Sequence, residues 1–271
     1  MIKKSDIETQ QWNTWLAGVI DGDGYFYISK AGSAQFELTT GVEDQRMLLS
    51  IQAEIGGQVK SRAGAEAIRL RIHKKDLIIN LLHRVNGHIR NPKRWPQFIM
   101  LCQHFGIHAI PAQPLTDNCC YIAGLFDADG SILISVSKAS ANHSILPGVQ
   151  GKRTRLTHSK GYNQLTIKIT SSFKDYLVEI QQALGFGSIV EQGANKLTRN
   201  PRVVYYWYCS NREHCLRWQM YINKCCLRSS KQKRMLLLAK YFEIKEKKYH
   251  LSNPTTGEFL VWQKFCTQWW F

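Results

Sequence analysis

The stretch Trp15-Leu16-Ala17-Gly18-Val19-Ile20-Asp21-Gly22-Asp23-Gly24 decides the fold of this chain, because a close copy of it follows later. The copy is Tyr121-Ile122-Ala123-Gly124-Leu125-Phe126-Asp127-Ala128-Asp129-Gly130. In both copies the apolar residues recur at helical spacing, which predicts a helix that ends at the Asp-x-Asp-Gly turn. The repeat predicts that the chain consists of two related halves.

The carboxylates of each copy stand at the unfavourable end of the predicted helix. The helix dipole disfavours an anion at the C-terminus by about 0.3–1 kcal/mol, and a cost repeated in both copies indicates a function, such as binding a divalent cation. A calcium loop of the EF-hand type also begins with Asp-x-Asp, but it needs Gly at the sixth position and Glu at the twelfth. The chain has Phe26 and Gly32, or Ile132 and Lys138, at those positions, which argues against an EF-hand.

Each copy also contains a pair of small residues, Ala17-Gly18 and Ala123-Gly124. Small side chains let two helices approach closely, so we expect the two motif helices to pack along this face. Their C-terminal turns would then lie side by side, with Asp23 and Asp129 in one site.

The two stretches resemble the LAGLIDADG motif of the homing endonucleases, and two copies in one chain resemble the single-chain, pseudo-symmetric members of that family. The departures are mild: Gly22 for the usual Ala, Val19 for Leu, and Ile122 and Phe126 in the second copy. The resemblance implies an α+β fold. It would have two pseudo-symmetric αββαββα repeats packed through the paired motif helices, each with a four-stranded antiparallel DNA-binding sheet.

The elements predicted after each motif follow this same order. Residues 88–93 also align without gaps with residues 226–231, so the repeat extends beyond the motif. We therefore assign an N-terminal half, a linker, a C-terminal half and a C-terminal tail to residues 1–105, 106–117, 118–242 and 243–271. The tail is rich in Trp, and we expect it to pack onto the C-terminal half rather than to stack on bases.

The composition points to nucleic acid. Lys and Arg outnumber Asp and Glu by 36 to 20, giving a formal net charge of +16, which predicts a polyanionic partner. No apolar run approaches the ~20 residues of a membrane span, and the N-terminus lacks the apolar core of a signal peptide. We expect an intracellular protein without a membrane partner. The 8 cysteines form no CxxC pair, so we expect reduced, mostly buried thiols.

A basic face is predicted on the hairpin near residues 59–72. Its last strand alternates strictly as Ile68-Arg69-Leu70-Arg71-Ile72, and its partner strand has Lys60 and Arg62 outward. A solvated charged face is the alternative, but we expect no acidic residue to balance the charge, which favours phosphate contact. With the outward positions of other elements, the predicted DNA-contacting residues are Tyr27, Ser29, Lys30, Glu37, Lys60, Arg62, Arg69, Arg71, Ser135, Lys138, Arg153, Arg155, Lys168, Arg90 and Arg228.

The segment between Lys138 and Gln164 has no counterpart of similar length in the first half. It contains several cations and no Asp or Glu, and its glycines and Pro147 argue against regular structure. We expect an arm that embraces DNA and orders on binding, with a disordered insertion as the alternative.

Hydrolysis of a phosphodiester requires that the phosphate charge be neutralised, a water activated and the leaving oxygen stabilised, and divalent metals can do all three. Carboxylate oxygens select hard ions over zinc. We therefore expect Mg²⁺ as the cofactor, with Mn²⁺ as a substitute.

The resemblance implies which residues form the active site. The acid before the last Gly of each motif would bind the metal with the adjacent carbonyl, which gives Asp23 with Gly24 and Asp129 with Gly130. Asp21 and Asp127 would be structural. The basic residues that organise water at the scissile phosphate would be Lys93 and Lys231, with Arg90 and Arg228 as alternates. Thr40 and Ser171 stand where many members have Gln, so the residue that positions the water stays open.

The resemblance implies a homing endonuclease encoded in an intron. Such an enzyme makes a double-strand break by metal-dependent phosphodiester hydrolysis at a long site, and unlike outward residues, such as Tyr27 against Leu133, predict an asymmetric site. We expect a monomer that binds double-stranded DNA, needs no protein partner and lies in an organelle if its intron is organellar. An RNA maturase and a DNA-binding regulator without nuclease activity are the alternatives.

Overall fold

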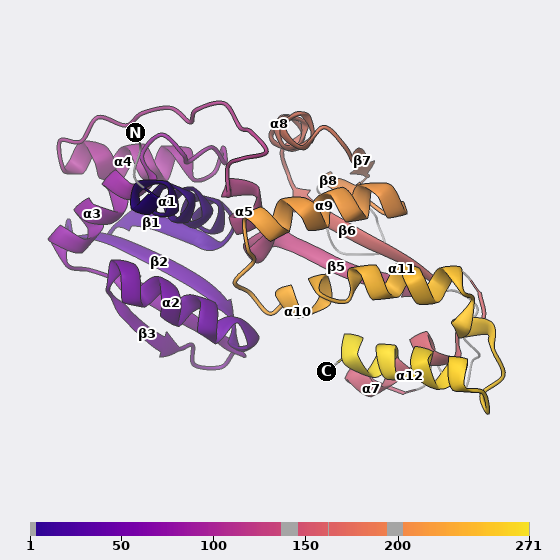
Figure 1. Ribbon diagram of the computed structural model, residues 1–271. Helices are drawn as coiled ribbons and strands as arrows, with labels where there is room; N and C mark the ends of the chain where they lie inside the picture. Colours follow the sequence, from indigo (N-terminus) through magenta and orange to yellow (C-terminus); the bar gives the residue numbers. More distant parts are fainter. Residues whose placement is uncertain (1–3, 137–145, 162, 194–202, 271) are drawn as a thin grey trace. The chain divides into compact units, whose positions relative to one another are not determined.

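The computed structural model describes residues 4–136, 146–161, 163–193 and 203–270 (Figure 1). The elements up to the linker are α1 (Lys4–Asp23), β1 (Gly24–Ile28), β2 (Ala34–Gly41), η1 (Val42–Asp44), α2 (Gln45–Ile55), β3 (Gln58–Ser61), β4 (Ala67–Ile72), α3 (Lys75–Val85) and α4 (Trp95–His104). The later elements are α5 (Tyr121–Asp129), β5 (Gly130–Val136), α7 (Gly148–His158), β6 (Asn163–Ser171), α8 (Lys174–Leu184), β7 (Ser188–Gln192), β8 (Val204–Cys209), α9 (Arg212–Lys224), α10 (Gln232–Met235), α11 (Leu238–Glu246), η2 (Tyr249–Leu251) and α12 (Gly257–Trp269). The predicted α+β fold is confirmed.

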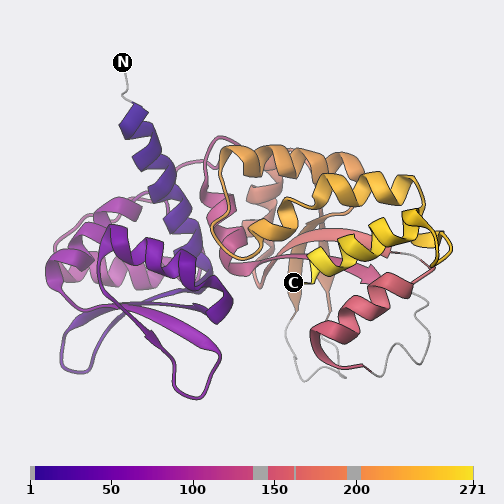
Figure 2. The same cartoon turned by 60° about the horizontal axis from the view of Figure 1, so that its bottom comes forward.

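The first sheet has the strand order β1-β2-β4-β3, with antiparallel neighbours. Its inward residues, such as Phe26, Phe36, Leu38 and Leu70, are fully buried. They pack under helices α1 to α4, which lie on one face of the sheet, while its other face is not covered by a helix (Figure 2). This alternation agrees with the half-buried strands that the sequence predicts.

The second sheet has the strand order β5-β6-β8-β7, which matches the first sheet strand for strand. Its inward residues include Ile132, Leu165, Ile167 and Trp207, all buried. Each repeat therefore contributes one four-stranded sheet, as the resemblance implied.

The chain divides into two compact units that do not follow the repeats. One comprises Met1–Gly130, Ile169–Trp207 and Tyr221–Ser230, and the other Ser131–Lys168, Tyr208–Met220 and Lys231–Phe271. The first unit contains both motif helices and the whole first sheet. The repeat boundaries assigned from the sequence stay a prediction. In the part of the chain that the structure describes, no helix is long and apolar enough to cross a membrane.

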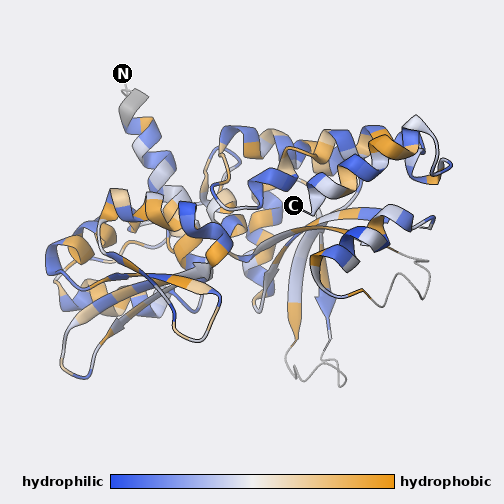
Figure 3. Cartoon of the chain, turned by 90° about the horizontal axis from the view of Figure 1, so that it is seen from below, coloured by the Kyte–Doolittle hydropathy of each residue, from blue (hydrophilic) through white to orange (hydrophobic). Residues whose placement is uncertain are grey.

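Helix α7 corrects the prediction that residues 138–164 lack regular structure. The helix follows Pro147 and buries Leu156 and Thr157. It packs against α12, where the Trp262 indole donates a hydrogen bond of 3.0 Å to the Thr157 carbonyl. Both helices contain hydrophilic and hydrophobic residues (Figure 3). Packing of α7 on α12 therefore stabilises a helix in a segment whose glycines and proline disfavour one. Trp262 and Trp269 are fully buried, and the expected packing of the tail is confirmed.

A disulfide between Cys120 and Cys225 corrects the expectation that all cysteines are thiols. Tyr221, on α9, explains the proximity. Its hydroxyl donates to the Cys119 carbonyl over 2.7 Å and accepts from the Ala123 amide over 3.1 Å, which holds the end of α9 against the start of α5. The other six cysteines are free, and four of them are buried.

Candidate active site

Helices α1 and α5 approach each other closely through their glycines. A Cβ added to Gly18 would lie 2.0 Å from the Tyr121 carbonyl oxygen, and one added to Gly124 would lie 1.8 Å from the Trp15 carbonyl oxygen. No side chain fits at either position without a shift of the backbone. The predicted contact through the small-residue pairs is confirmed.

The first aspartate of each motif is buried and ties the motif helix to a loop. Asp21 accepts from the backbone N–H groups of Arg90 and Asn91 over 2.8 and 3.0 Å. Asp127 accepts in the same way from Arg228 and Ser229 over 2.9 and 3.0 Å. These loop residues fall within the two stretches that align in the sequence, so the distant repeat has a structural counterpart. Burial raises the pKa of Asp21 to about 6, against the lowering effect of its hydrogen bonds.

The motif helices also exchange hydrogen bonds and cation–π contacts. The Trp15 indole on α1 donates to Asp127 over 2.9 Å, and the Tyr121 hydroxyl on α5 donates to Asp21. The Arg228 guanidinium lies over the Trp15 ring and that of Arg90 over the Tyr121 ring, both at 4.7 Å from the ring centroid. In each direction, therefore, the aromatic residue of one motif helix binds the first aspartate of the other.

The second aspartate of each motif, in contrast, is accessible. Asp23 is half-buried and Asp129 is exposed, each in the last residue of its helix. A Cβ added to Gly22 would lie 3.2 Å from a carboxylate oxygen of Asp129 and 2.4 Å from the Ala128 Cβ. The last turns of α1 and α5 are thus in contact, as the small-residue pairs predict, and the sharing of one site by the two acids stays a prediction.

The oxygen donors at these helix ends fit a hard divalent cation. The accessible carboxylates of Asp23 and Asp129 and the carbonyls of Gly24 and Gly130 all present oxygen, which Mg²⁺ prefers. In the described ranges no group of three or more His, Cys, Asp or Glu could hold a metal ion. A cation held here would complete its ligands from water and a bound phosphate.

Lys93 lies in the loop that Asp21 holds. Its side chain is exposed, with the ammonium 5.8 Å from the centre of the Phe173 ring. Its backbone N–H donates to the Asn91 side chain over 2.9 Å, and the Asn91 amide donates to the Asp21 carbonyl over 2.8 Å. Asn91 thereby links Lys93 to the end of α1. Lys231, its counterpart in the sequence, precedes α10 in the other unit and is half-buried.

Arg94 is a residue at this site that the sequence reasoning missed. Its guanidinium donates a hydrogen bond of 2.9 Å to the Gly22 carbonyl, in the last turn of α1. A cation there opposes the negative end of the helix dipole. The signal in the sequence was a second basic residue directly after Lys93.

Arg90 is placed differently from the other predicted DNA contacts. Its side chain is only 5% exposed, and it pairs with Glu179 and donates to the Gln113 carbonyl. Arg228 is exposed, although its guanidinium lies on the Trp15 ring. The burial of Arg90 favours Lys93 over Arg90 as the residue that meets the phosphate.

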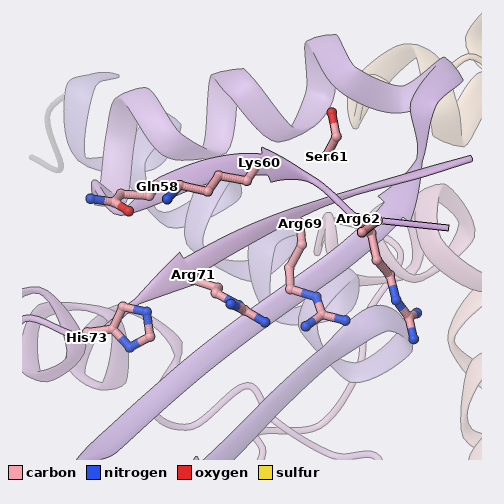
Figure 4. Close-up of a pocket in the computed structure, with 8 residues that line it drawn as sticks. Gln58, Lys60, Ser61, Arg62, Arg69, Arg71 and His73 are labelled. Atoms are coloured by element: carbon pink, nitrogen blue, oxygen red, sulfur yellow. The ribbon is translucent and has the colours of Figure 1, made fainter. Parts of the chain in front are cut away.

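The uncovered face of the first sheet brings most of the predicted contacts of the first half together. The strand register aligns Tyr25, Glu37, Arg71 and Gln58 in one row across the four strands. Beside the β4 and β3 end of this row lies a hollow of about 300 Å³, lined by Gln58, Lys60, Ser61, Arg62, Ala63, Arg69, Arg71 and His73 (Figure 4).

The expectation that this face has no acidic residue is wrong. Glu37 forms ion pairs with Arg69 and Arg71, because β2 places it directly opposite Arg71. Tyr25, which the sequence reasoning missed, is exposed and stacks on Tyr27 with 5.2 Å between the ring centroids. The inward position of Phe26 already implied that Tyr25 points outward.

The remaining predicted contacts have varied surroundings. Lys30, Lys60, Arg62 and Ser135 are exposed, while Ser29 and Lys168 are half-buried. Arg153 and Arg155 lie half-buried on α7, and Arg155 donates to the Leu146 carbonyl over 3.2 Å. Lys138 lies outside the described residues.

Comparison with known proteins agrees with this geometry. The family described as LAGLIDADG endonuclease matches residues 16–90 and 122–242. A probable intron-encoded endonuclease of Debaryomyces hansenii is 31% identical over 259 residues, covering 95% of this chain and 37% of that protein. An intron-encoded RNA maturase of Saccharomyces cerevisiae is 32% identical over 259 residues, covering 96% of this chain and 36% of that protein. This chain thus spans about a third of the length of these two relatives.

A solved structure has the same fold. It is the meganuclease I-SmaMI bound to uncleaveable DNA, with a TM-score of 0.68 and 17% identity, covering 95% of this chain and 97% of that one. The family match includes the C-terminal part of α1, nearly all of α5, both sheets, and Arg90, Arg228 and Ser229, whose backbone N–H groups bind the buried aspartates. The chain belongs to the LAGLIDADG endonuclease family.

Proposed function

We propose that this chain is a sequence-specific DNA endonuclease that makes a metal-dependent double-strand break at a long, asymmetric site. The observation that carries the proposal is the contrast between the two pairs of aspartates. Asp21 and Asp127 are buried in hydrogen bonds, whereas Asp23 and Asp129 are accessible at the touching ends of α1 and α5. A carboxylate with a purely structural role has no need to be accessible, so the accessibility of this position in both copies favours metal binding.

Each residue of the site has a distinct task in this proposal. Asp23 and Asp129, with the carbonyls of Gly24 and Gly130, would hold Mg²⁺, or Mn²⁺ in its place. When bound, the metal would neutralise the phosphate, activate water and stabilise the leaving oxygen. The exposed ammonium of Lys93 would hold water or a phosphate oxygen by a charge-assisted hydrogen bond, and Lys231 would do so for the second strand. Asn91 and Arg94 position the end of α1.

The binding partner in this proposal is double-stranded DNA, taken up by one chain without a protein partner. The net charge of +16 and the basic face of the first sheet support a phosphate backbone as the ligand. The relatives are named as intron-encoded. We propose an intron-encoded homing enzyme, located in an organelle if its intron is organellar.

Selection of cleaved sequences from a randomised duplex library in Mg²⁺ tests the function directly. We expect one long, asymmetric site to be cut on both strands. Replacement of Mg²⁺ by Ca²⁺ should preserve binding and stop cutting, because Ca²⁺ accepts looser geometry and more ligands. Cleavage in EDTA, or in Ca²⁺ alone at the rate seen in Mg²⁺, would contradict the proposed metal site.

RNA maturation is the second candidate, because one relative at 32% identity is named an RNA maturase. The basic surface could also bind a structured intron. A splicing assay with the intron that encodes the chain separates the two functions. Splicing that survives Asp129→Asn, with no DNA cut by the unaltered protein, would assign the chain to maturation alone.

A further inference from the structure

We propose that Arg71 reads a guanine in the target site and that Glu37 is the positioning residue that fixes its guanidinium. The inference rests on the proposed function, because it names a base that the first sheet recognises in DNA. It divides the cluster of charges on this face into residues with different tasks.

The contacts of Arg71 leave its recognition edge available. Its Nε forms an ion pair with Glu37 Oε1 over 2.8 Å, and its side chain is 47% exposed. Within the ranges that the structure describes, the two terminal amino groups of Arg71 have no recorded acceptor. A guanidinium anchored through Nε presents these two groups as a fork, and the side chain projects from the uncovered face (Figure 4).

Guanine is the base that matches such a fork. In the major groove it presents the acceptors O6 and N7 side by side, and two parallel N–H donors bind them together. Glu37 fixes the rotamer of Arg71 before DNA arrives, so less rotamer freedom is lost on binding. One carboxylate between two guanidinium groups also leaves a net positive charge, which the polyanion requires.

Arg69 has a different set of contacts. Its Nε donates to the Thr39 hydroxyl over 3.0 Å and its Nη1 pairs with Glu37 Oε2 over 3.0 Å. Only Nη2 is left without a recorded acceptor among the described residues, so Arg69 cannot offer a pair of unengaged donors from two nitrogens. Arg69 therefore stabilises the ion pairs around Glu37 or makes a single contact with DNA, while Arg71 discriminates guanine from the other bases.

Glu37 itself is poorly arranged to contact a base. A carboxylate can accept from the amino group of cytosine, but both oxygens of Glu37 are already engaged. Oε1 faces the Arg71 Nε over 2.8 Å and Oε2 faces Arg69 over 3.0 Å, while the Tyr27 hydroxyl makes its shorter hydrogen bond to Gln35. The side chain of Glu37 is only 14% exposed. Its effect on specificity thus passes through Arg71.

Selection of bound sequences from a randomised duplex library, in Ca²⁺ so that no strand is cut, tests the inference. The unaltered protein should enrich guanine at one position of the site. Arg71→Ala should lower that preference by roughly 10- to 100-fold, the range expected for one bidentate pair. Glu37→Gln, which keeps the shape and removes the charge, should weaken the preference at the same position.

The double variant separates positioning from direct contact. Glu37→Gln in the Arg71→Ala background should cause no further loss at that guanine. Lys60→Ala is the matched control, because an exposed cation on the neighbouring strand should weaken binding to all sequences alike. Thermal unfolding of each variant checks that the sheet is intact.

Three results would overturn the inference, and they differ in whether the proposed endonuclease function is contradicted as well. If the unaltered protein selects a site but Arg71→Ala changes no position, the guanine contact is wrong and the endonuclease proposal stands. If Glu37→Gln alters a cytosine position in the absence of Arg71, Glu37 contacts the base directly. If the unaltered protein selects no sequence at all, sequence-specific binding fails together with the inference.

Discussion

At the scale of single residues, four aspartates of the same two motifs have opposite environments. Asp21 and Asp127 each accept two backbone N–H groups and a side-chain donor from the other motif helix. Asp23 and Asp129 are two positions further along, where the helix ends and solvent begins. A shift of two residues turns a helical side chain by about 200°, which suffices to separate a structural carboxylate from an accessible one.

Asp129→Asn should leave folding and DNA affinity nearly unchanged and lower cleavage by roughly 100-fold or more, since metal stabilisation is worth several kcal/mol. Asn keeps the size and one carbonyl oxygen but removes the charge that attracts the metal. Asp23→Asn should behave alike. The products on a duplex labelled on each strand measure the effect. Loss of cleavage on both strands together would indicate that the two aspartates share one ion. Loss of cleavage on one strand would indicate that each aspartate binds its own ion.

Asp127→Asn is the matched control for this experiment. Its carboxylate is buried and hydrogen-bonded to Ser229 and Trp15, so the change should lower the urea midpoint of unfolding. Cleavage of both strands by Asp129→Asn at the normal rate would mean that the accessible aspartates are structural too.

His250 predicts a loss of stability in acid. Burial and the nearby Lys245 lower the pKa of His250 from 6.5 to about 4, and the Lys245 ammonium lies 3.2 Å from its Nε2. The unfolded chain takes up a proton below pH 6.5, whereas the folded chain does so only near pH 4. Stability should therefore fall as the pH decreases from about 6.5 to 4, and below pH 4 this residue should cause no further loss.

Thermal unfolding between pH 7 and 4 measures this effect. His250→Gln should flatten the curve in that window, because no imidazole is left to protonate against Lys245. His108→Gln, at an exposed position, controls for the loss of an imidazole. Equal slopes for the unaltered protein and His250→Gln would remove His250 as the cause.

The repeat in the sequence singles out candidate site residues, whereas contacts between distant residues are not visible in it. Asp23 and Asp129 stand out because the motif recurs. The link from Arg94 to Gly22 and the bond between Cys120 and Cys225 join residues distant in the chain, and each half lacks a repeat of them. The basic pair Lys93-Arg94 marks Arg94 as a candidate, but the local pattern does not give its partner Gly22 or the pairing of Cys120 with Cys225.

At the scale of elements, the crossing of α1 and α5 depends on two glycines. Gly18→Ala should destabilise the protein by about 1–3 kcal/mol, as overpacking does, although Ala favours helices by ~1 kcal/mol over Gly. The new Cβ would lie 2.0 Å from the Tyr121 carbonyl oxygen, a backbone atom that cannot move alone. Urea unfolding measures the change.

Gly257→Ala is the matched control for Gly18→Ala. It lies at the start of α12, and an added Cβ there meets nothing within 4 Å. It should leave stability unchanged or slightly raised. If Gly18→Ala behaved like Gly257→Ala, the close contact between the motif helices would not be a source of stability.

Most helices and strands could be predicted, because their apolar residues have a period. Met47, Leu48, Ile51 and Ile55 recur at helical spacing in the sequence, and α2 (Gln45–Ile55) buries all four. Helix α7 could not be predicted, since its own sequence is polar and begins with Pro147 and Gly148. It packs on α12, where its hydrogen-bond partner Trp262 lies more than 100 residues later in the chain.

At the scale of the whole molecule, the charge predicts a steep dependence of DNA binding on salt. The logarithm of the binding constant should fall with the logarithm of salt concentration by about 0.9 for each phosphate neutralised. Replacing both Lys60 and Arg62 by Ala should flatten the slope by up to about twice that value, because both are exposed on the basic face. Binding titrations from low to moderate salt measure the slope.

Lys247→Ala is the control for charge alone, since Lys247 pairs with Glu243 on α11. It should leave the slope unchanged. The same titration with Arg153→Ala and Arg155→Ala tests the predicted contact of the second half. An unaltered slope and affinity would leave these two arginines with a role in packing α7.

The reciprocal bonds of Trp15 and Tyr121 restrict how the two halves of this gene can be exchanged. Each motif helix supplies the donor for the other half's buried carboxylate, through Trp15 to Asp127 and Tyr121 to Asp21. A hybrid that takes one half from a relative would inherit an aspartate without its donor unless the foreign helix offers one at the same position. Recombination between members of such a lineage is therefore constrained to transfer the donor and the aspartate of each pair together, even though they are encoded 112 codons apart in one pair and 100 in the other.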